Sequence, residues 1–260
     1  MHLVPWTTEI ASQLKILFAD DRPIPIRLWA MLDGSSQSRI LVDELSRPTV
    51  AILQELAEGA TYIGGAVTPP AVADAFALLR QYQEVVVGLW PGDPLMVVLP
   101  GAPDYTGTAI DFTDRSPAVD LKRLTVVPAG YRLRRIDEEL VPALEGFAYY
   151  VSMFGSVECA LQNTIGYCLM HDEIVACEAV AGPLTRGLAE MGVGTREAYR
   201  GKGFATLTSA RVIQACEALG YRAFWNAAQQ NVASVALAKK LGFQTERAFT
   251  VLAWSAVAPR

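Results

Sequence analysis

The chain has 260 residues, of which 52% are apolar and 19% are charged, and its formal net charge is -5 at pH 7. This composition excludes extended disorder, which requires few apolar residues and many charges. The acidic balance argues against broad nucleic-acid binding, which requires a basic surface. We therefore expect one large or two modest globular domains and no nucleic-acid partner.

The N-terminal segment and the cysteines of the chain carry no targeting or metal signal. The first residues lack a basic start followed by an apolar stretch, and no run of about 18 apolar residues occurs. The four cysteines form no C-x-x-C pair and have no histidine at metal-binding spacing. We therefore predict a cytoplasmic protein with reduced cysteines, no metal and no membrane partner.

The first half of the chain alternates between helix and strand patterns. Helices are expected over residues 8–18, 25–32 and 69–81, and strands over 39–42, 49–53, 61–64, 84–89 and 95–99. Between these elements lie proline and glycine turns. The segment 1–128 is therefore predicted to be an α/β domain, and it contains no recognisable catalytic motif.

A domain boundary is predicted near Pro128-Ala129-Gly130, so the second domain would span 129–260. Strands are expected over 131–136, 165–170, 173–181, 188–195 and 222–226, and helices over 137–145, over 147–162 with a break at Gly155, and up to Leu219. His171-Asp172 is a turn pair typical of a hairpin. Between Arg196 and Arg247 there are eight basic residues against three acidic ones, which favours a small polyanionic ligand.

The strand over 188–195 is unusual because glycines lie beside a carboxylate. Alternation places Glu190, Gly192 and Gly194 on one face. Glycines within a strand often mark the close approach of a ligand or another backbone. The alternative is a glycine-rich strand packed under a helix, with Glu190 at a solvated edge.

The segment Tyr199-Arg200-Gly201-Lys202-Gly203-Phe204-Ala205 follows this strand and leads into a helix. A helix N-terminus carries partial positive charge and unsatisfied N–H donors, so it is a natural phosphate site. The glycines would let a phosphate approach, and the two basic side chains would add charge. The segment lacks the spacing of nucleoside triphosphatases and of dinucleotide-binding folds.

Arg200-x-x-Gly203-x-Ala205 resembles the acetyl-CoA signature of the GNAT N-acetyltransferase superfamily. The resemblance continues in chain order with a strand at 222–226, Asn231, Ser234 and the segment Lys240-Leu241-Gly242-Phe243. It covers residues 130 to 255, about half of the chain.

The resemblance implies an α/β (α+β) fold with a mixed, mostly antiparallel sheet flanked by helices. Acetyl-CoA would lie in the gap where the strand 188–195 splays from the strand 222–226, with its pyrophosphate on the loop amides and its arm along the strand backbone. The implied cofactor-binding residues are Val193, Gly194, Thr195, Arg200, Gly201, Lys202, Gly203, Phe204, Ala205 and Asn231. The first half would suit a degenerate copy of the same fold.

In such a family an amine attacks the thioester directly, which requires an oxyanion donor, a proton acceptor and an acid for the thiolate. The N–H of Val193 is the expected oxyanion donor, and Glu190 the expected acceptor of the amine proton. Glu178 is a second candidate, with a surface charge as the equal alternative. Many relatives carry a tyrosine acid where this chain has Ala238, so Ser234, a water molecule or no acid would serve.

Trp225 and Asn226 are expected to border the opening for the acceptor, together with Phe154 and Glu178, although Trp225 fits a core position equally well. The resulting prediction is an acetyl-CoA-dependent N-acetyltransferase (a transferase, more narrowly an acyltransferase) that acetylates the amine of a small-molecule or amino-acid-like acceptor. The alternative is a non-catalytic module that binds or senses acyl-CoA. Either protein would be a monomer or a homodimer.

Overall fold

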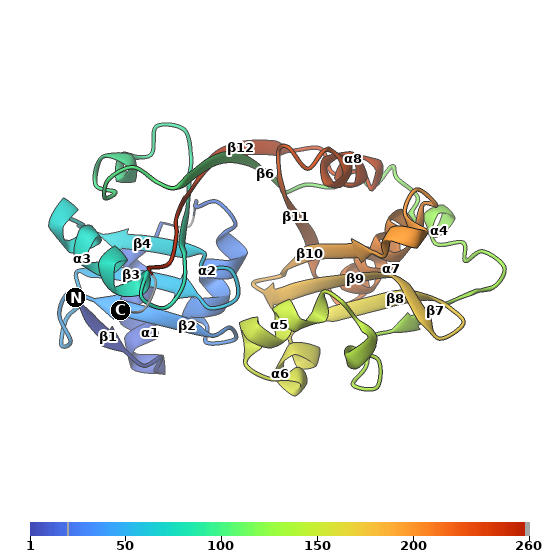
Figure 1. Cartoon of the computed structure of the whole chain (residues 1–260), viewed down its shortest axis with the longest axis horizontal. Helices are drawn as coiled ribbons and strands as arrows, with labels where there is room; N and C mark the ends of the chain where they lie inside the picture. The colour runs from blue at the N-terminus through green and yellow to red at the C-terminus, as the bar shows by residue number, and fades with distance from the viewer. Residues whose placement is uncertain (20, 258–260) are drawn as a thin grey trace. The chain divides into compact units, whose positions relative to one another are not determined.

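The structure is a computed structural model that describes residues 1–19 and 21–257 (Figure 1). The chain forms two compact units. The first unit contains Met1–Ala109 and the chain from Ala248 onward, and the second contains Ile110–Arg247. The division predicted from the sequence, 1–128 and 129–260, differs from these units. The difference arises because strand β6 (Tyr105–Phe112) leads into the second unit and strand β12 (Glu246–Trp254) leads out of it.

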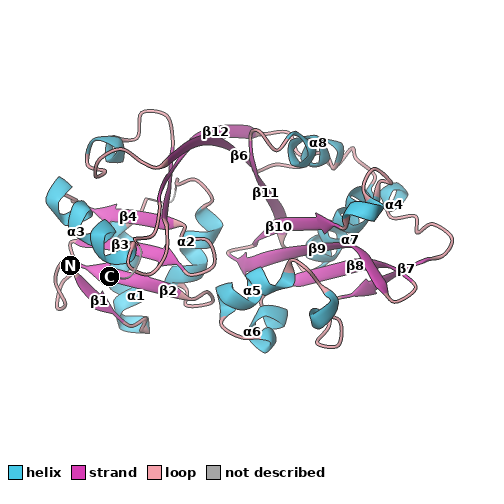
Figure 2. Ribbon diagram, in the orientation of Figure 1, coloured by secondary structure: helices cyan, strands magenta, loops and turns pink. Residues whose placement is uncertain are grey.

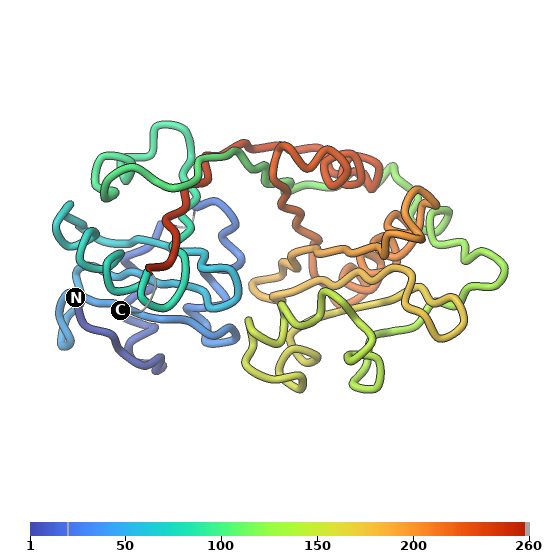
Figure 3. Tube along the Cα trace, in the orientation of Figure 1, coloured from blue at the N-terminus to red at the C-terminus, as the bar shows by residue number. Residues whose placement is uncertain are grey.

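The first unit contains a four-stranded antiparallel sheet in the order β1-β2-β3-β4. Its strands are β1 (His2–Val4), β2 (Ser38–Val42), β3 (Val50–Glu55) and β4 (Thr61–Gly65), and β5 (Val85–Leu89) pairs with β12. Its helices are α1 (Thr8–Leu14), α2 (Pro25–Leu32) and α3 (Pro69–Leu79). Both ends of the described chain lie in this unit, to which β12 returns (Figure 3).

The second unit contains a mixed sheet in the order β6-β11-β10-β9-β8-β7. Its other strands are β7 (Tyr131–Arg135), β8 (Ile165–His171), β9 (Ile174–Thr185), β10 (Leu188–Thr195) and β11 (Arg222–Ala228). Its helices are α4 (Leu121–Leu124), α5 (Phe147–Phe154), α6 (Val157–Gln162), α7 (Phe204–Ala218) and α8 (Val232–Lys240). Within the described residues, no helix is long and apolar enough to cross a membrane.

The two faces of this sheet carry different helices (Figure 2). On one face Ala179 and Met191 belong to a core cluster that also contains Val212 and Ile213 of α7. On the opposite face the Tyr150 hydroxyl of α5 donates to the carbonyl of Val180. The sheet is therefore covered by α7 on one side and approached by α5 on the other.

Most elements expected from the sequence are confirmed. The helix over 25–32 has the expected bounds, and the expected hairpin of β8 and β9 is present. Its two turn residues are Asp172, at φ 52°, and Glu173 rather than the expected His171 and Asp172, because His171 still pairs with Ile174 in the sheet. The expected break in the helix over 147–162 is also confirmed. Gly155 adopts φ 86° and ends α5, and the Ser156 side chain caps α6 by accepting from the N–H of Cys159.

Two expected elements are wrong. The segment 95–99 is a 3-10 turn, Pro94–Val97, rather than a strand, because the Asp93 side chain accepts from the N–H of Leu95 and starts a helical turn. The segment 137–145 contains only the 3-10 turn Val141–Ala143 rather than a helix. Pro142 has no N–H to donate in a longer helix.

The turn after β4 yields a stability prediction. Gly65 adopts φ +85°, and a Cβ there would overlap the backbone carbonyl of Thr49, whereas Gly92 has a similar φ of +78° with open space around it. We expect Gly92→Ala to cost about 1–2 kcal/mol from backbone strain alone, and Gly65→Ala to cost at least about 2 kcal/mol more because the backbone must shift. Chemical denaturation measures both, and equal losses would contradict the prediction.

Candidate functional site

The site begins where two parallel strands separate. β10 and β11 pair in parallel over three residues only, from Leu188 with Arg222 to Glu190 with Phe224. β10 then continues to Thr195, and β11 to Ala228, and no further residue pairs join these two described strands. Backbone N–H and C=O groups are strong hydrogen-bonding groups, so the separated strand edges offer donors and acceptors to a ligand.

The loop after β10 ends in an open helix N-terminus. Gly203 precedes α7 with φ 80°, and no side chain caps the helix. The first N–H groups of a helix have no acceptor within it and carry partial positive charge. Gly201 also has a positive φ of 76°, and a Cβ at either glycine would meet nothing within 4 Å. This arrangement is an open cradle of N–H donors.

A cavity of about 440 Å³ follows the inner side of this loop. We call it the loop cavity, and its lining residues are Val193, Gly194, Thr195, Tyr199, Arg200, Gly201, Gly203, Phe204, Ala205, Asn231, Ala233, Ser234 and Leu237. The lining includes every residue predicted to bind the cofactor except Lys202, whose amino group lies 5.1 Å from the centre of the Tyr199 ring. The cofactor role of these residues stays a prediction.

The side of the loop cavity formed by α8 is fixed by hydrogen bonds. The Asn231 side chain accepts from the N–H of Ser234, which caps the helix. The Ser234 hydroxyl accepts from the indole N–H of Trp225 at 3.0 Å. An indole N–H only donates, so the oxygen of Ser234 must be the acceptor and its own proton is available elsewhere.

Aromatic rings pack against the loop between β10 and α7 and against the start of α7. Tyr131 of β7 packs against His171 at 4.8 Å and against Phe204 at 4.7 Å between ring centroids. The Tyr199 hydroxyl lies 3.4 Å from Nδ1 of His171. These contacts hold the start of α7 in place, although the sequence analysis did not single out Tyr131 or His171 for this role.

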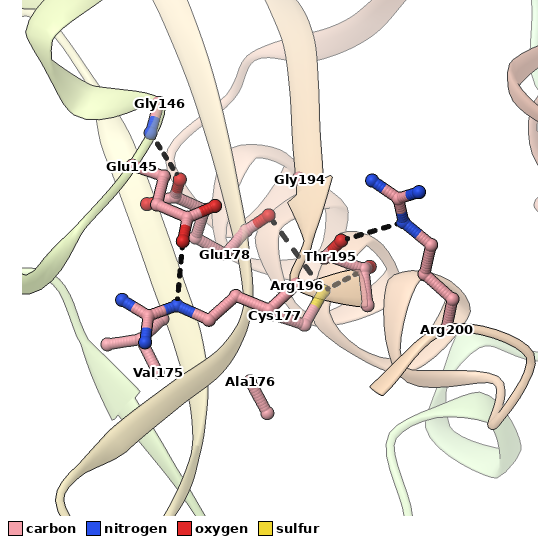
Figure 4. A pocket seen from close by; sticks show the side chains of 10 residues that line it. All are labelled: Glu145, Gly146, Val175, Ala176, Cys177, Glu178, Gly194, Thr195, Arg196 and Arg200. Carbon is pink, nitrogen blue, oxygen red and sulfur yellow. Dashed lines mark hydrogen bonds and ion pairs between the residues drawn. The ribbon is translucent and has the colours of Figure 1, made fainter. Parts of the chain in front are cut away.

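A second cavity, of about 280 Å³, lies beside the C-terminal end of β10 (Figure 4). We call it the Glu178 cavity, and its lining residues are Glu145, Gly146, Val175, Ala176, Cys177, Glu178, Gly194, Thr195, Arg196 and Arg200. Gly194, Thr195 and Arg200 line both cavities. The two cavities therefore adjoin along the end of β10.

Glu178 is the buried carboxyl of this second cavity. It is 7% exposed and pairs in register with Gly194, so its side chain lies on the face that the glycine leaves open. One carboxyl oxygen accepts from the N–H of Gly146, and Oε2 is buried without a hydrogen-bond partner. Burial is the main cause that raises the pKa of Glu178, and Glu145 raises it further, while the Gly146 N–H and Arg196 oppose the rise.

Glu190 occupies a different place from Glu178. It is 6% exposed, so the alternative that placed it at a solvated edge is wrong. It lies at the last paired position of β10, opposite Phe224, and lines neither cavity. Its role as the acceptor of the amine proton stays a prediction.

The residues expected at the acceptor opening are distributed differently. Trp225 is 1% exposed and belongs to the core cluster beside α7, so its placement at the opening is corrected to the core position. The Asn226 amide donates to Asp111 at 2.7 Å and to the carbonyl of Ile110. Phe154 is 4% exposed and lines neither cavity.

Among the described residues, no group of three or more histidine, cysteine, aspartate or glutamate side chains is placed to hold a metal ion. Three cysteines are buried, and Cys159 is exposed. Sequence reasoning missed the contributions of Glu145, Gly146 and Arg196 to the Glu178 cavity. No local motif marks them, because they meet Glu178 only through the packing of distant segments.

Comparisons with known proteins agree with this geometry. A family model described as GNAT acetyltransferase matches residues 109–252, more than half of the chain. The protein named "Uncharacterized N-acetyltransferase YdfB" from Bacillus subtilis (strain 168) is 34% identical over 132 residues, which are 50% of this chain and 51% of that protein. The match therefore spans about half the length of this curated relative.

Two solved structures resemble the chain over nearly its whole length. The GCN5-related N-acetyltransferase-like protein from Streptococcus suis 89/1591 gives a TM-score of 0.70 at 23% identity, covering 93% of this chain and 98% of that chain. A tandem GNAT protein from the clavulanic acid biosynthesis pathway gives a TM-score of 0.66 at 15% identity, covering 100% and 99%. These likenesses show the fold, and they extend it to the first unit.

The capping role of Asn231 gives a prediction that is independent of any ligand. Asn231→Ala removes the acceptor for the N–H of Ser234 and should lower the free energy of unfolding by about 1 kcal/mol. Asn231→Asp keeps an oxygen acceptor and should stay within about 0.5 kcal/mol of the parent. Urea denaturation compares the two variants, and an equal loss in both would show that the cap contributes nothing.

Proposed function

Because the chain belongs to the GNAT acetyltransferase family, we propose that it is an acetyl-CoA-dependent N-acetyltransferase acting on the amine of a small-molecule or amino-acid-like acceptor. The observation that carries this proposal is the loop cavity, which joins the separated edge of β10 to the uncapped N-terminus of α7. One end of this cavity suits phosphate groups and the other suits an amide-containing chain. Acetyl-CoA has this combination.

The cradle fits the anionic part of acetyl-CoA. The N–H groups from Gly201 to Ala205 would hold the pyrophosphate, with the dipole of α7 favouring its charge. Arg200 donates through Nε to the carbonyl of Thr195, which fixes its guanidinium beside the cavity. Val193, Thr195 and Asn231 line the same cavity and would hold the pantetheine arm. Bound there, acetyl-CoA would supply the activated acetyl group.

The amine must lose a proton, and two carboxyl groups on one face of the sheet are the candidates to accept it. Glu190 and Glu178 are both buried on neighbouring strands. The N–H of Val193, at the separated edge of β10, is the proposed donor to the oxyanion that forms on the thioester carbonyl. Removing one such donor typically costs about 100-fold or more in turnover.

The thiolate requires a proton donor other than residue 238. Ala238 is fully buried and has no polar group. Ser234 lines the loop cavity, and its oxygen already accepts from Trp225, so its hydroxyl proton can turn toward the cavity. We therefore assign Ser234 as the donor to the leaving thiolate.

A non-catalytic module that binds or senses acyl-CoA is the second candidate. Ala238 favours it, because the position where many relatives carry an acid has no proton to give. One measurement distinguishes the N-acetyltransferase from the non-catalytic module: the release of free thiol from acetyl-CoA in the presence of amines. A saturable, amine-dependent rate excludes the non-catalytic module.

The cofactor assignment predicts that Gly203→Glu weakens acetyl-CoA binding about 100-fold or more. The added side chain would fill the cradle and place a negative charge beside the phosphates, which removes about 3 kcal/mol of charge-assisted hydrogen bonding. Gly220→Glu is the matched control, because Gly220 follows the other end of α7 with φ +82° and equally open surroundings. Calorimetry should give parental affinity for this control. Equal affinity in both variants contradicts the assignment.

The assignment of Ser234 predicts that Ser234→Ala lowers kcat about 100-fold and changes acetyl-CoA affinity less than about threefold. The control is Trp225→Phe, which removes the same hydrogen bond but keeps the hydroxyl. If the two variants lose kcat equally, the hydrogen bond rather than the proton matters. Thioesters with a more acidic thiol should lose less on Ser234→Ala, because such a thiol leaves without an acid.

A further inference from the structure

One carboxyl oxygen of Glu178, beside the Glu178 cavity, is buried without a hydrogen-bond partner. Glu178 is 7% exposed. The N–H of Gly146 donates to one carboxyl oxygen, and the N–H of Glu145 also stabilises the carboxylate. Its Oε2 is buried and has no partner. Buried polar atoms are nearly always hydrogen-bonded, and an unsatisfied one costs about 1–3 kcal/mol. Glu178 also lines the cavity, so the unsatisfied oxygen belongs to a residue that a ligand in the cavity would contact.

The charged neighbours of Glu178 do not satisfy this oxygen. Arg196 is the basic group that acts on Glu178, but its guanidinium is held by Glu145 at 3.0 Å and by the carbonyl of Ala143 at 3.1 Å. Figure 4 shows the Arg196 side chain directed to Glu145 and the Glu178 carboxyl directed to Gly146. The missing partner must donate a hydrogen bond, and a cationic donor suits a carboxylate best.

Gly194, Thr195 and Arg200 join the Glu178 cavity to the loop cavity, and of the three only Gly194 has no side chain. Gly194 lies opposite Glu178 in the sheet and lines both cavities. A Cβ at Gly194 would lie 3.6 Å from Oε1 of Glu178, so any larger side chain would fill the passage. Val193, the proposed oxyanion donor, is the residue next to Gly194, whereas Glu190 lies three residues from Val193, about 10 Å along a strand.

We propose that the Glu178 cavity is the acceptor subsite and that Oε2 of Glu178 binds the ammonium group of a small primary alkylamine. The inference rests on the proposed N-acetyltransferase function and makes the position of the acceptor specific. Two carboxyl groups, of Glu145 and Glu178, and two guanidinium groups, of Arg196 and Arg200, line the cavity. Arg196 is paired with Glu145, and Arg200 donates to the carbonyl of Thr195, so Glu178 is the carboxyl that remains for a cationic ligand. Glu178, rather than Glu190, then accepts the proton of the amine.

The proton transfer balances as follows. An N–H bond of the ammonium breaks, its electron pair stays on nitrogen, and the proton moves to Oε2, which makes Glu178 a neutral acid. The amine forms a bond to the thioester carbonyl carbon, and the carbon–sulfur bond breaks with its electrons on sulfur. Ser234 delivers a proton to the thiolate, and the second proton that nitrogen loses on becoming an amide restores the Ser234 hydroxyl. Glu178 returns its proton to solvent.

The surroundings of Glu178 suit this exchange. Burial raises the pKa of the carboxyl, so its conjugate acid forms more readily than that of an exposed glutamate. The groups that act on it are the N–H groups of Gly146 and Glu145, the charge of Glu145 and the charge of Arg196. Glu178 in turn acts on the buried thiols of Cys168 and Cys177. Burial raises the pKa of both thiols, to about 11 for Cys168, so they stay neutral while Glu178 titrates.

A direct test uses the amide of Gly146 as a reporter in NMR spectra. This N–H donates to Glu178, so its chemical shift should follow the ionisation of that carboxyl. Ethylammonium chloride is the probe, and sodium propionate is its anionic counterpart. We expect ethylammonium to shift the Gly146 resonance saturably and to move its titration to lower pH, because the cation stabilises the carboxylate. Propionate should do neither. If ethylammonium leaves the resonance unchanged, the subsite does not exist.

Glu178→Gln separates the proposed role from a structural one. Glutamine keeps an oxygen that accepts from Gly146, so a purely structural Glu178 tolerates the change. We expect the variant to lose the ethylammonium response and to lower kcat/KM for ethylamine about 100-fold, with acetyl-CoA affinity unchanged by calorimetry. Retained activity and response overturn the proposal. If the parent protein fails to bind acetyl-CoA, the proposed function fails, whereas the Gly146 reporter still decides the subsite.

Glu145→Gln provides a pH-dependent readout. The rate should rise with pH as Glu178 loses its proton, and the charge of Glu145 raises the pKa of Glu178. Removing that charge should move both this rise in kcat/KM and the Gly146 titration to lower pH. If Glu178 does not contact the amine, the pH at which kcat/KM rises should stay the same while the pH dependence of the Gly146 resonance moves. That outcome contradicts the proposal.

Discussion

The short pairing of β10 with β11 is the constraint on which the site depends. Three residue pairs join the strands, and the remaining edge of β10 faces α8 across the loop cavity. If the pairing continued, the backbone groups of Val193 and Thr195 would be used within the sheet. Because it stops at Glu190, the carbonyl of Thr195 accepts from Arg200 instead, and the other backbone groups of this edge are left for a ligand. The same divergence makes room for Asn231 and Ser234.

The second consequence of this divergence lies on the other face of β10. Gly192 and Gly194 have no side chains, and the space above each is taken by a group from another element. A Cβ on Gly192 would meet the Tyr150 hydroxyl, and one on Gly194 would meet Glu178. The glycines thus do more than clear a strip for a ligand. They let a tyrosine from α5 and a carboxyl from β9 come close to the backbone that lines the loop cavity.

Local signals made part of this arrangement predictable. The phosphate loop, the start of α7 and the cap at Asn231 are each set by neighbouring residues, and the structure brings them together around one cavity. Local sequence signals could not predict the Glu178 cavity. Its carboxyl is anchored by Gly146, 32 positions away, and no local pattern reports that contact. Trp225 was undecided for the same reason, because strand alternation does not say which face carries α7.

The basic stretch between Arg196 and Arg247 also has a more specific meaning in three dimensions. Arg196 pairs with Glu145, Arg222 with Asp114 and Lys239 with Glu246, so much of the local positive charge is already balanced by carboxylates. Arg200 remains beside the loop cavity, with its Nε on a backbone carbonyl. A polyanion at this site would therefore depend mainly on backbone N–H groups and the dipole of α7, whose donors are fixed in direction before any ligand arrives. This explains how a chain with a net charge of -5 can offer a phosphate site, because the attraction resides in oriented peptide groups and needs no basic surface.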